Sequence, residues 1–282
     1  MELSAEILAL RPYLFRIAYN MLGVAADAED IVHDVFEKWM TVEQARDPKA
    51  YLARMTINRS IKRLEELKAL RESYTGPWLP EPLITFEPDP SPTIEYGLLF
   101  LLERLNPAER AVFILRESFS QEYSHIAELT GMAEENCRQL LHRAHERLRR
   151  TTTRPVDPER HRALTEAFLF SLAQQDRSSL EHLLRNDIEL YSDGGGKRAA
   201  ALKPLFGFEK VLKFLFGVMQ LPDGKAELYG YRHVFVNGAP AMLLFRKDSG
   251  AWDSLVYVDA DERQIARLLY MRNPDKLHGR EE

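Results

Sequence analysis

Apolar residues recur at spacings of three and four along most of the first 150 residues, a pattern that predicts amphipathic helices. Residues 4–40 hold two such segments, the first ending near Gly23 and the second beginning at Asp27. A third segment covers residues 47–71, with Pro48 in its first turn, a position that proline favours. Each segment has one apolar face, so we expect this part of the chain to be helical.

Residues 123–150 combine a short helical segment, a glycine and a second helical segment rich in arginine. The first segment places Ile126, Ala127 and Leu129 on one face, and Gly131 then supplies a turn in which a positive φ is tolerated. The second segment begins at about residue 133 and has one apolar and one basic face. This is the layout of a helix-turn-helix DNA reader. The alternative is an amphipathic surface helix with a solvated basic face.

Two changes in composition divide the chain. Residues 75–94 contain six of the 15 prolines, and no Lys, Arg or His occurs between Glu72 and Glu103. An extended, acidic linker is therefore predicted there. The second change is at residues 151–158, TTTRPVDP, which separate the helix-turn-helix segment from the last part of the chain.

That last part mixes helical and strand patterns. Helices are predicted over 158–185 and 207–220, and a strand over IELYSDGGGK. Four alternating segments come after them, in ELYGYRHVFV, AMLLFRK, WDSLVYVD and IARLLYMR. We expect one helical layer against a curved antiparallel sheet, which is an α+β domain.

Length, charge and cysteine content limit the number of domains, the kind of DNA-binding surface and the compartment that we expect. A length of 282 residues allows two or three domains, and the net charge of −5 requires any DNA-binding surface to be a local basic patch. The single cysteine, Cys137, cannot form an internal disulfide and fits a reducing cytosol. No signal peptide, membrane span or metal-ligand spacing is apparent, so we expect a cytoplasmic protein without a cofactor.

Four pentapeptides occur in order: WLPEP at 78–82, NCRQL at 136–140, DGGGK at 193–197 and NPDKL at 273–277. Together they resemble one subgroup of bacterial extracytoplasmic-function sigma factors, in which a SnoaL-like domain is fused to the sigma core. The resemblance covers the whole chain. It implies promoter recognition rather than catalysis, with core RNA polymerase and promoter DNA as partners.

The resemblance also implies a domain plan and a fold class. The plan is a region 2 promoter-melting helical domain (1–74), the linker (75–94), a region 4 helix-turn-helix domain (95–154) and a SnoaL-like regulatory domain (157–282). The fold class is multidomain, with an all-α sigma core followed by an α+β cone. In the family the linker threads through polymerase channels that RNA otherwise uses.

Three sets of polar residues match binding positions of the family. Contact with the β′ clamp helices of polymerase is implied for Asp30, His33 and Asp34, with His33 in place of the usual glutamine. Reading of the minus-ten element is implied for Arg54, Asn58, Arg59, Lys62 and Arg63. Reading of the minus-thirty-five element is implied for Glu135, Asn136, Arg138, Gln139, His142 and Arg143. These residue types reach base edges and phosphates, although a solvated charged helix face is the alternative for the first two sets.

A fourth set is implied to regulate the sigma core from within the chain, in place of a separate anti-sigma protein. The linker motif, the glycine loop and the tail motif are expected to meet, since glycines allow close approach and a Trp-Leu pair usually needs a docking surface. The residues are Trp78, Leu79, Pro80, Glu81 and Pro82, then Asp193, Gly194, Gly195, Gly196 and Lys197, and finally Asn273, Pro274, Asp275, Lys276 and Leu277.

Catalysis in the last domain needs a general acid or base in a pocket. The available residues are Asp193, His233, Asp253, Tyr229 and Tyr231, and no acid and base are paired at a readable spacing. We therefore expect no catalytic residue. Three functions stay open: a sigma factor with a fused regulatory domain, a helix-turn-helix regulator that is not a sigma factor, and a bifunctional protein whose C-terminal pocket binds or converts a small ligand.

Overall fold

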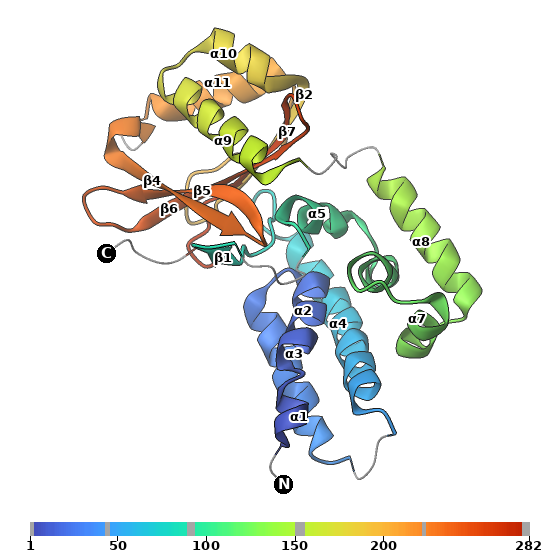
Figure 1. Cartoon of the computed structure of the whole chain (residues 1–282). Helices are drawn as coiled ribbons and strands as arrows, with labels where there is room; N and C mark the ends of the chain where they lie inside the picture. Colours follow the sequence, from blue (N-terminus) through green and yellow to red (C-terminus); the bar gives the residue numbers. More distant parts are fainter. Residues whose placement is uncertain (1–2, 43–45, 89–93, 150–155, 222–223, 278–282) are drawn as a thin grey trace. The chain divides into compact units, whose positions relative to one another are not determined.

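The computed structural model describes residues 3–42, 46–88, 94–149, 156–221 and 224–277 (Figure 1). The chain forms two compact units. The helical unit comprises Met1–Ser73, Ser91–Ile94 and Leu98–Thr152, and the α+β unit comprises Tyr74–Pro90, Glu95–Gly97 and Thr153–Glu282. Most of the predicted linker therefore belongs to the α+β unit.

The helical unit begins with the three predicted helices and one extra turn. The elements are α1 (Ala5–Leu8), α2 (Arg11–Leu22), α3 (Ala25–Trp39) and α4 (Pro48–Glu72). Gly23 ends α2 with a φ of 69°, and the Asp47 carboxylate caps α4 by accepting from the Ala50 N–H at 3.0 Å. Leu14 of α2, Val35 of α3 and Leu52 of α4 are fully buried between these helices.

The second half of the helical unit contains the helix-turn-helix. Its elements are α5 (Tyr96–Leu101), the 3-10 turn η1 (Leu102–Arg104), α6 (Pro107–Phe113), the π-helical turn η2 (Ile114–Ser118), α7 (Tyr123–Thr130) and α8 (Glu134–Leu148). Asn106 and Glu109 form a capping box at the start of α6. Gly131 ends α7 with a φ of 73°, as the turn requires. Cys137, Leu140 and Ala144 of α8 are buried, so the predicted apolar face is confirmed.

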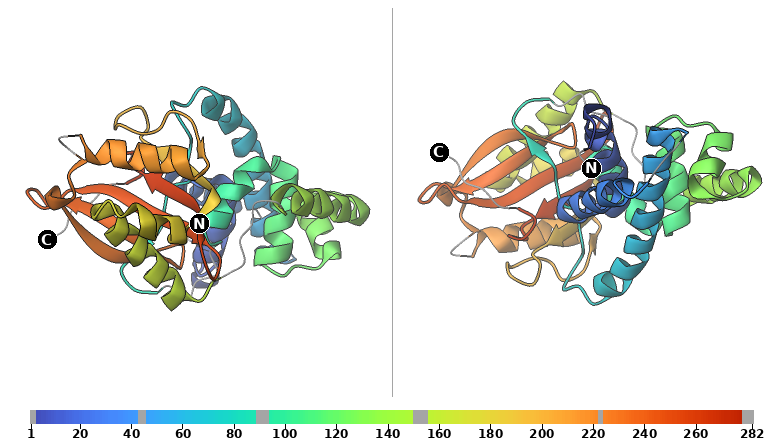
Figure 2. Two further views of the ribbon diagram at one scale, coloured as in Figure 1. Left: turned by 90° about the horizontal axis from the view of Figure 1, so that it is seen from above. Right: turned by 90° about the horizontal axis from the view of Figure 1, so that it is seen from below.

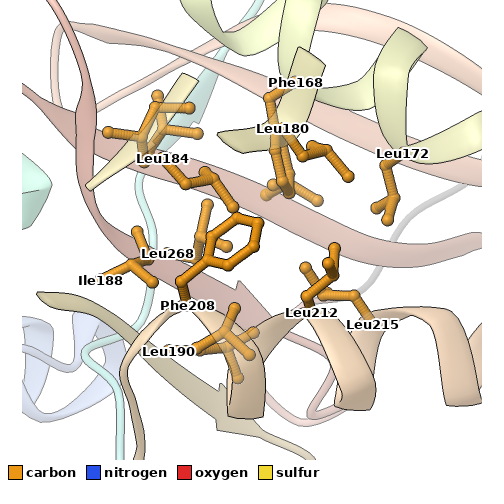
Figure 3. Packing of buried hydrophobic residues seen from close by; sticks show 14 of the residues in the cluster. Phe168, Leu172, Leu180, Leu184, Ile188, Leu190, Phe208, Leu212, Leu215 and Leu268 are labelled. Atoms are coloured by element: carbon orange, nitrogen blue, oxygen red, sulfur yellow. The ribbon is translucent and has the colours of Figure 1, made fainter. Parts of the chain in front are cut away.

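The α+β unit has one helical layer on a mixed sheet (Figure 2). Its elements are α9 (Pro158–Ala173), α10 (Arg177–Leu183), β2 (Leu184–Asp193), β3 (Leu205–Phe206), α11 (Phe208–Met219), η4 (Ala226–Leu228), β4 (Tyr229–Val236), β5 (Ala239–Arg246), β6 (Trp252–Ala260) and β7 (Ile265–Met271). With β1 (Ile84–Thr85), the described strands form one sheet in the order β1-β4-β5-β6-β7-β2-β3. Side chains from α9, α10, α11 and the sheet form its core (Figure 3).

Three expectations about this unit need correction. The predicted helix over 158–185 is two helices, because Gln175 takes a φ of 53° and Asp176 caps a new helix by accepting from the Ser179 N–H. The sheet is not wholly antiparallel, because β2 and β7 pair in parallel. The linker is not only extended chain, because its β1 pairs with the edge strand β4, Ile84 opposite Val236.

Candidate functional site

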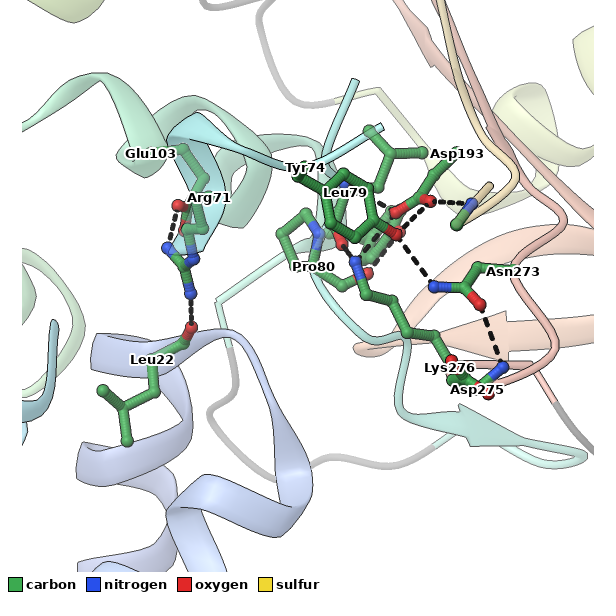
Figure 4. Close-up of polar contacts among 12 residues, drawn as sticks. Leu22, Arg71, Tyr74, Leu79, Pro80, Glu103, Asp193, Asn273, Asp275 and Lys276 are labelled. Atoms are coloured by element: carbon green, nitrogen blue, oxygen red, sulfur yellow. Dashed lines mark hydrogen bonds and ion pairs between the residues drawn. The ribbon is translucent and has the colours of Figure 1, made fainter. Parts of the chain in front are cut away.

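Asp193, at the end of β2, is a fully buried carboxylate at the centre of a network (Figure 4). Its Oδ1 accepts from the Tyr74 hydroxyl at 2.6 Å and from the Gly195 N–H at 3.0 Å. Its Oδ2 accepts from the Leu79 N–H at 3.0 Å and from Lys276 Nζ at 2.8 Å. The carboxylate therefore joins the linker, the glycine loop and the tail motif.

Lys276 of the tail motif holds the linker from the opposite side. Its ammonium donates to the Leu79 carbonyl at 2.7 Å and lies 4.2 Å from the centre of the Trp78 ring. Leu79 is fully buried, whereas Trp78 is half-buried. Asn273 Nδ2 donates to the Tyr74 hydroxyl at 2.8 Å. Burial beside Asp193 raises the pKa of Tyr74, which therefore stays a hydrogen-bond donor at neutral pH.

The three glycines of the loop have separate reasons to lack a side chain. A Cβ at Gly194 would lie 2.2 Å from the Arg198 carbonyl oxygen, within the loop itself. A Cβ at Gly195 would lie 2.4 Å from Cγ of Asn273, and Gly196 faces Thr75 of the linker. Gly195 and Gly196 also have positive φ angles, of 61° and 71°. The loop is thus fitted to the tail motif and to the linker.

The rest of the three motifs surrounds this network. Pro80, Pro82 and Leu277 are buried, Glu81 is half-buried, and Pro274 is exposed. Lys197 pairs with Asp275 at 2.6 Å on the surface. The sequence thus identified residues that the structure brings together within the α+β unit.

A second attachment, which the sequence did not reveal, holds the far end of the linker. The Tyr96 hydroxyl donates to the Pro80 carbonyl at 2.8 Å, and the Tyr257 hydroxyl donates to Glu95 at 2.6 Å. The two tyrosine rings meet edge to face, with centroids 5.5 Å apart. Burial raises the pKa of Tyr257 well above its ordinary value.

The predicted minus-thirty-five residues lie on the exposed face of α8. Arg138, Gln139, His142 and Arg143 line one shallow hollow, and Glu135 and Asn136 are exposed on the preceding turn. Arg138 pairs with Glu134 at 3.2 Å and lies 4.2 Å from the centre of the Tyr123 ring. Such exposed contacts contribute little to stability.

The predicted minus-ten residues lie along α4, and some of them are engaged within the helical unit. Arg54, Asn58 and Lys62 are exposed, and Arg54 lies near the turn glycine, Gly131. Arg63 pairs with Asp27 of α3 at 2.8 Å. Arg59 pairs with Asp34 of α3 at 2.6 Å, and so joins a predicted DNA contact to a predicted polymerase contact. Asp30 and His33 are exposed on the same helix.

A buried charge cluster inside the helical unit was missed at the level of sequence. Glu103 of η1 pairs with both Arg71 of α4 and Arg110 of α6. Arg71 also donates to the Leu22 carbonyl at 2.6 Å (Figure 4). Arg110 donates to the Asn20 carbonyl at 3.1 Å. The cluster joins the first helices to the helix-turn-helix half.

The α+β unit also contains a cavity of about 1510 Å³. His233, Asp253, Tyr229 and Tyr231 line it, whereas Asp193 does not. No acid and base are paired at a readable spacing in the sequence, but the fold brings two distant residues together: His233 Nε2 lies 2.9 Å from the Glu166 carboxylate, and both line the cavity. Desolvation and the nearby Arg162 lower the pKa of His233. Among the residues that the structure describes, no group of three metal-ligating side chains occurs, and no helix is long and apolar enough to cross a membrane.

Comparison with known proteins matches the two halves of the helical unit separately. Residues 7–69 match the family described as Sigma-70 region 2, and residues 97–148 match Sigma-70, region 4. Over 300 aligned residues the chain is 29% identical to the ECF RNA polymerase sigma factor SigJ of Mycobacterium tuberculosis, covering 99% of this chain and 94% of that protein. The chain belongs to the extracytoplasmic-function sigma factors. It is therefore an alternative sigma factor that directs transcription initiation.

One further relative and one solved structure show how far the similarity extends. The probable ECF RNA polymerase sigma factor SigI of the same organism is 31% identical over 192 residues, 64% of this chain and 66% of that protein. The crystal structure of SigJ superposes with a TM-score of 0.77 at 26% identity, covering 96% of this chain and 97% of that one. The fold thus matches a sigma factor of this type along its whole length, including the C-terminal α+β domain.

Proposed function

We propose that α3 binds the β′ clamp helices of core RNA polymerase through Asp30, His33 and Asp34, with further contacts to the β subunit, and that the protein works in the cytoplasm. The exposed acidic face of α3 supports this, since it suits a basic partner. The α4 residues then read the minus-ten element, and the α8 residues read the minus-thirty-five element.

The α+β unit acts as a built-in brake on this activity. The observation that carries the proposal is the buried Asp193, whose oxygens hold both the Tyr74 side chain and the Leu79 backbone of the linker. A linker bound in this way, with Leu79 inaccessible and β1 paired into the sheet, is not available to line a polymerase channel. Release of the linker is therefore the step that activates the protein.

A matched pair of glycine variants tests the brake by run-off transcription with core polymerase. In Gly195→Ala, the new Cβ would lie 2.4 Å from Asn273 and must displace the tail motif. In Gly217→Ala, the Cβ on α11 meets nothing within 4 Å, so the contacts of the linker stay intact. We expect more transcript from Gly195→Ala and no change from Gly217→Ala. Equal output from the two variants would sink the proposed regulation.

Turnover of a small molecule is a second function, and only the His233–Glu166 pair favours it. We propose that this pair does not catalyse. The Glu166 carboxylate is shared with Arg162 at 3.0 Å, and the His233 and Glu166 side chains are 35% and 45% exposed, so the pair is solvated. Turnover of any ligand that disappears in His233→Ala would reverse this assignment. A regulator that is not a sigma factor is disfavoured by the region 2 match.

A further inference from the structure

The cavity of the α+β unit has an apolar body. Its walls include Phe170 of α9, Phe214 and Val218 of α11, and Met242 and Leu244 of β5. Its volume of about 1510 Å³ is larger than that of most small-molecule pockets. Such walls favour a ligand with a large hydrocarbon portion.

The lining of the cavity also includes polar residues, among them a partly buried ion pair. Arg272 Nη2 lies 3.2 and 3.3 Å from the two Asp253 oxygens. Asp253 occupies a bulge, since the pairing of β5 with β6 passes from Leu244–Ser254 to Phe245–Trp252. Ser192, Ser254 and Tyr270 line the same cavity. These polar residues can therefore bind a polar head group.

Arg272 also holds the glycine loop at two points. Its backbone N–H donates to the Asp193 carbonyl at 2.7 Å, and its Nη1 donates to the Ala199 carbonyl at 2.8 Å. Lys197 of the loop lines the cavity, as do Arg198 and Ala199, which directly follow the loop. The same loop faces Thr75 and Asn273 through Gly196 and Gly195. The cavity and the linker thus share one loop.

The charges around the cavity favour an anion. Its described lining carries five cationic side chains and three carboxylates, namely Lys197, Arg198, Arg246, Lys247 and Arg272 against Glu166, Asp248 and Asp253. Among the described residues, the Arg198 guanidinium has no hydrogen-bond or ion-pair partner in the chain. A monoanionic head group therefore finds a cation that no described residue of the chain neutralises.

We propose that the cavity binds an amphipathic organic acid and that Arg272 transmits its presence to the linker. A bound carboxylate is a stronger acceptor for the guanidinium than the neutral Ala199 carbonyl is. Binding therefore draws Arg272 away from Ala199, loosens the loop and frees the linker. The consequence for transcription rests on the proposed brake, whereas the binding itself does not.

The first test uses the full-length protein and needs no polymerase. The fluorescent dye 1-anilinonaphthalene-8-sulfonate serves as the probe, and decanoate and decanol compete with it. We expect decanoate to displace the dye at about tenfold lower concentration than decanol, because only the acid pairs with the cations. Val218→Trp, which fills the apolar body, should weaken dye binding by a similar factor. Equal displacement by acid and alcohol, or undiminished dye binding by Val218→Trp, would overturn the site.

The second test measures amide hydrogen exchange of the linker peptide 74–83, with a peptide from α3 as the control. Decanoate should speed linker exchange by about threefold or more and leave the α3 peptide unchanged, since only the linker opens. Arg272→Lys keeps the charge but lacks the planar fork, so it should bind decanoate without the linker response. A response retained in Arg272→Lys, or no response in the wild type, would overturn the relay.

Asp253→Asn is a further variant, and it should strengthen the binding of decanoate. It removes the carboxylate that competes for Arg272, so decanoate should bind at least about threefold more tightly. Unchanged or weaker binding by a folded Asp253→Asn protein would contradict the role of Arg272. None of these readouts involves transcription, so they fail or succeed separately from the glycine variants.

Discussion

Charged side chains occupy two contrasting settings in this sigma factor. On α8, Arg138 and Arg143 are more than half exposed, and their ion pairs within the chain are long, at 3.2 and 4.0 Å. At the linker site, the Asp193 and Lys276 side chains are 0% and 10% exposed, and each Asp193 carboxylate oxygen accepts two hydrogen bonds.

The contrast separates exposed charges that are weakly paired from buried charges that are fully paired within the chain. A buried ion must be fully paired within the chain, because an unpaired one is strongly destabilising. An exposed ion contributes little to folding and is free to bind DNA. The largest effects on stability should therefore come from the linker site, and the largest effects on promoter choice from α8.

Asp193→Ala should have the largest effect on stability of the variants considered. It removes the carboxylate that pairs with the Lys276 ammonium and that accepts from the Tyr74 hydroxyl and the Leu79 N–H, so we expect the α+β unit to lose about 3–5 kcal/mol of its free energy of unfolding. Differential scanning calorimetry of the full chain measures this loss. Asp248→Ala, which removes the exposed partner of Arg246, is the matched control and should be much milder. Equal losses would show that the linker site is not the stabilising one.

Substitutions on the exposed face of α8 should weaken promoter binding and leave stability almost unchanged. Arg138→Ala or Arg143→Ala should lose about 1–3 kcal/mol of promoter binding if the side chain contacts a base, with little change in thermal stability. Fluorescence anisotropy on promoter duplexes altered one base pair at a time gives the readout. Loss of discrimination at one position marks a base contact, and uniform weakening marks a phosphate contact. Normal binding by both variants would mean that α8 is misassigned.

Polymerase binding can be separated from internal pairing with a charge swap. Asp34→Lys should weaken assembly with core polymerase about tenfold, which is about 1.4 kcal/mol. Because Asp34 also pairs with Arg59, the double variant Asp34→Lys, Arg59→Glu restores an internal ion pair. Native gel shifts should show assembly still impaired in the double variant. Recovery there would assign the defect to the internal pair.

The smallest expected effect is a pH dependence. Burial lowers the pKa of His161, whose Nε2 donates to the Val258 carbonyl at 2.6 Å. Because this pKa is lower in the folded protein, His161 takes up its proton at a higher pH in the unfolded chain than in the folded one. Its contribution to the free energy of unfolding is therefore fully present above about pH 6.5 and falls as the pH drops below that value. The slope is at most about 1.4 kcal/mol per pH unit for one proton. His233 adds a slope of the same sign, so His161→Gln should reduce the dependence rather than abolish it.

Periodicity and turn residues in the sequence were enough to predict α2, α3, α4, the helix-turn-helix and most strands, because these depend on local spacing. The break at Gln175 was missed, since a positive φ at glutamine leaves no clear signal in the sequence. The Arg71–Glu103 and Glu166–His233 pairs were missed because their members are distant in sequence. The linker contacts were anticipated only through the resemblance of the motifs.

The most direct test of the brake is a disulfide between the linker and the glycine loop. A Cβ at Gly196 would lie 3.4 Å from Cβ of Thr75, close to the spacing of about 3.5–4.5 Å in disulfides. Thr75→Cys and Gly196→Cys in a Cys137→Ser background leave no other thiol. Run-off transcription with core polymerase is then compared between the oxidised and reduced protein, with each single-cysteine variant as a control.

We expect the oxidised protein, with its linker locked, to give about tenfold less transcript than the same protein after reduction, because the locked linker cannot leave its site. The single-cysteine controls should give equal output under both conditions. Equal transcript from the locked and the reduced double-cysteine protein would contradict the claim that docking of the linker restrains this sigma factor.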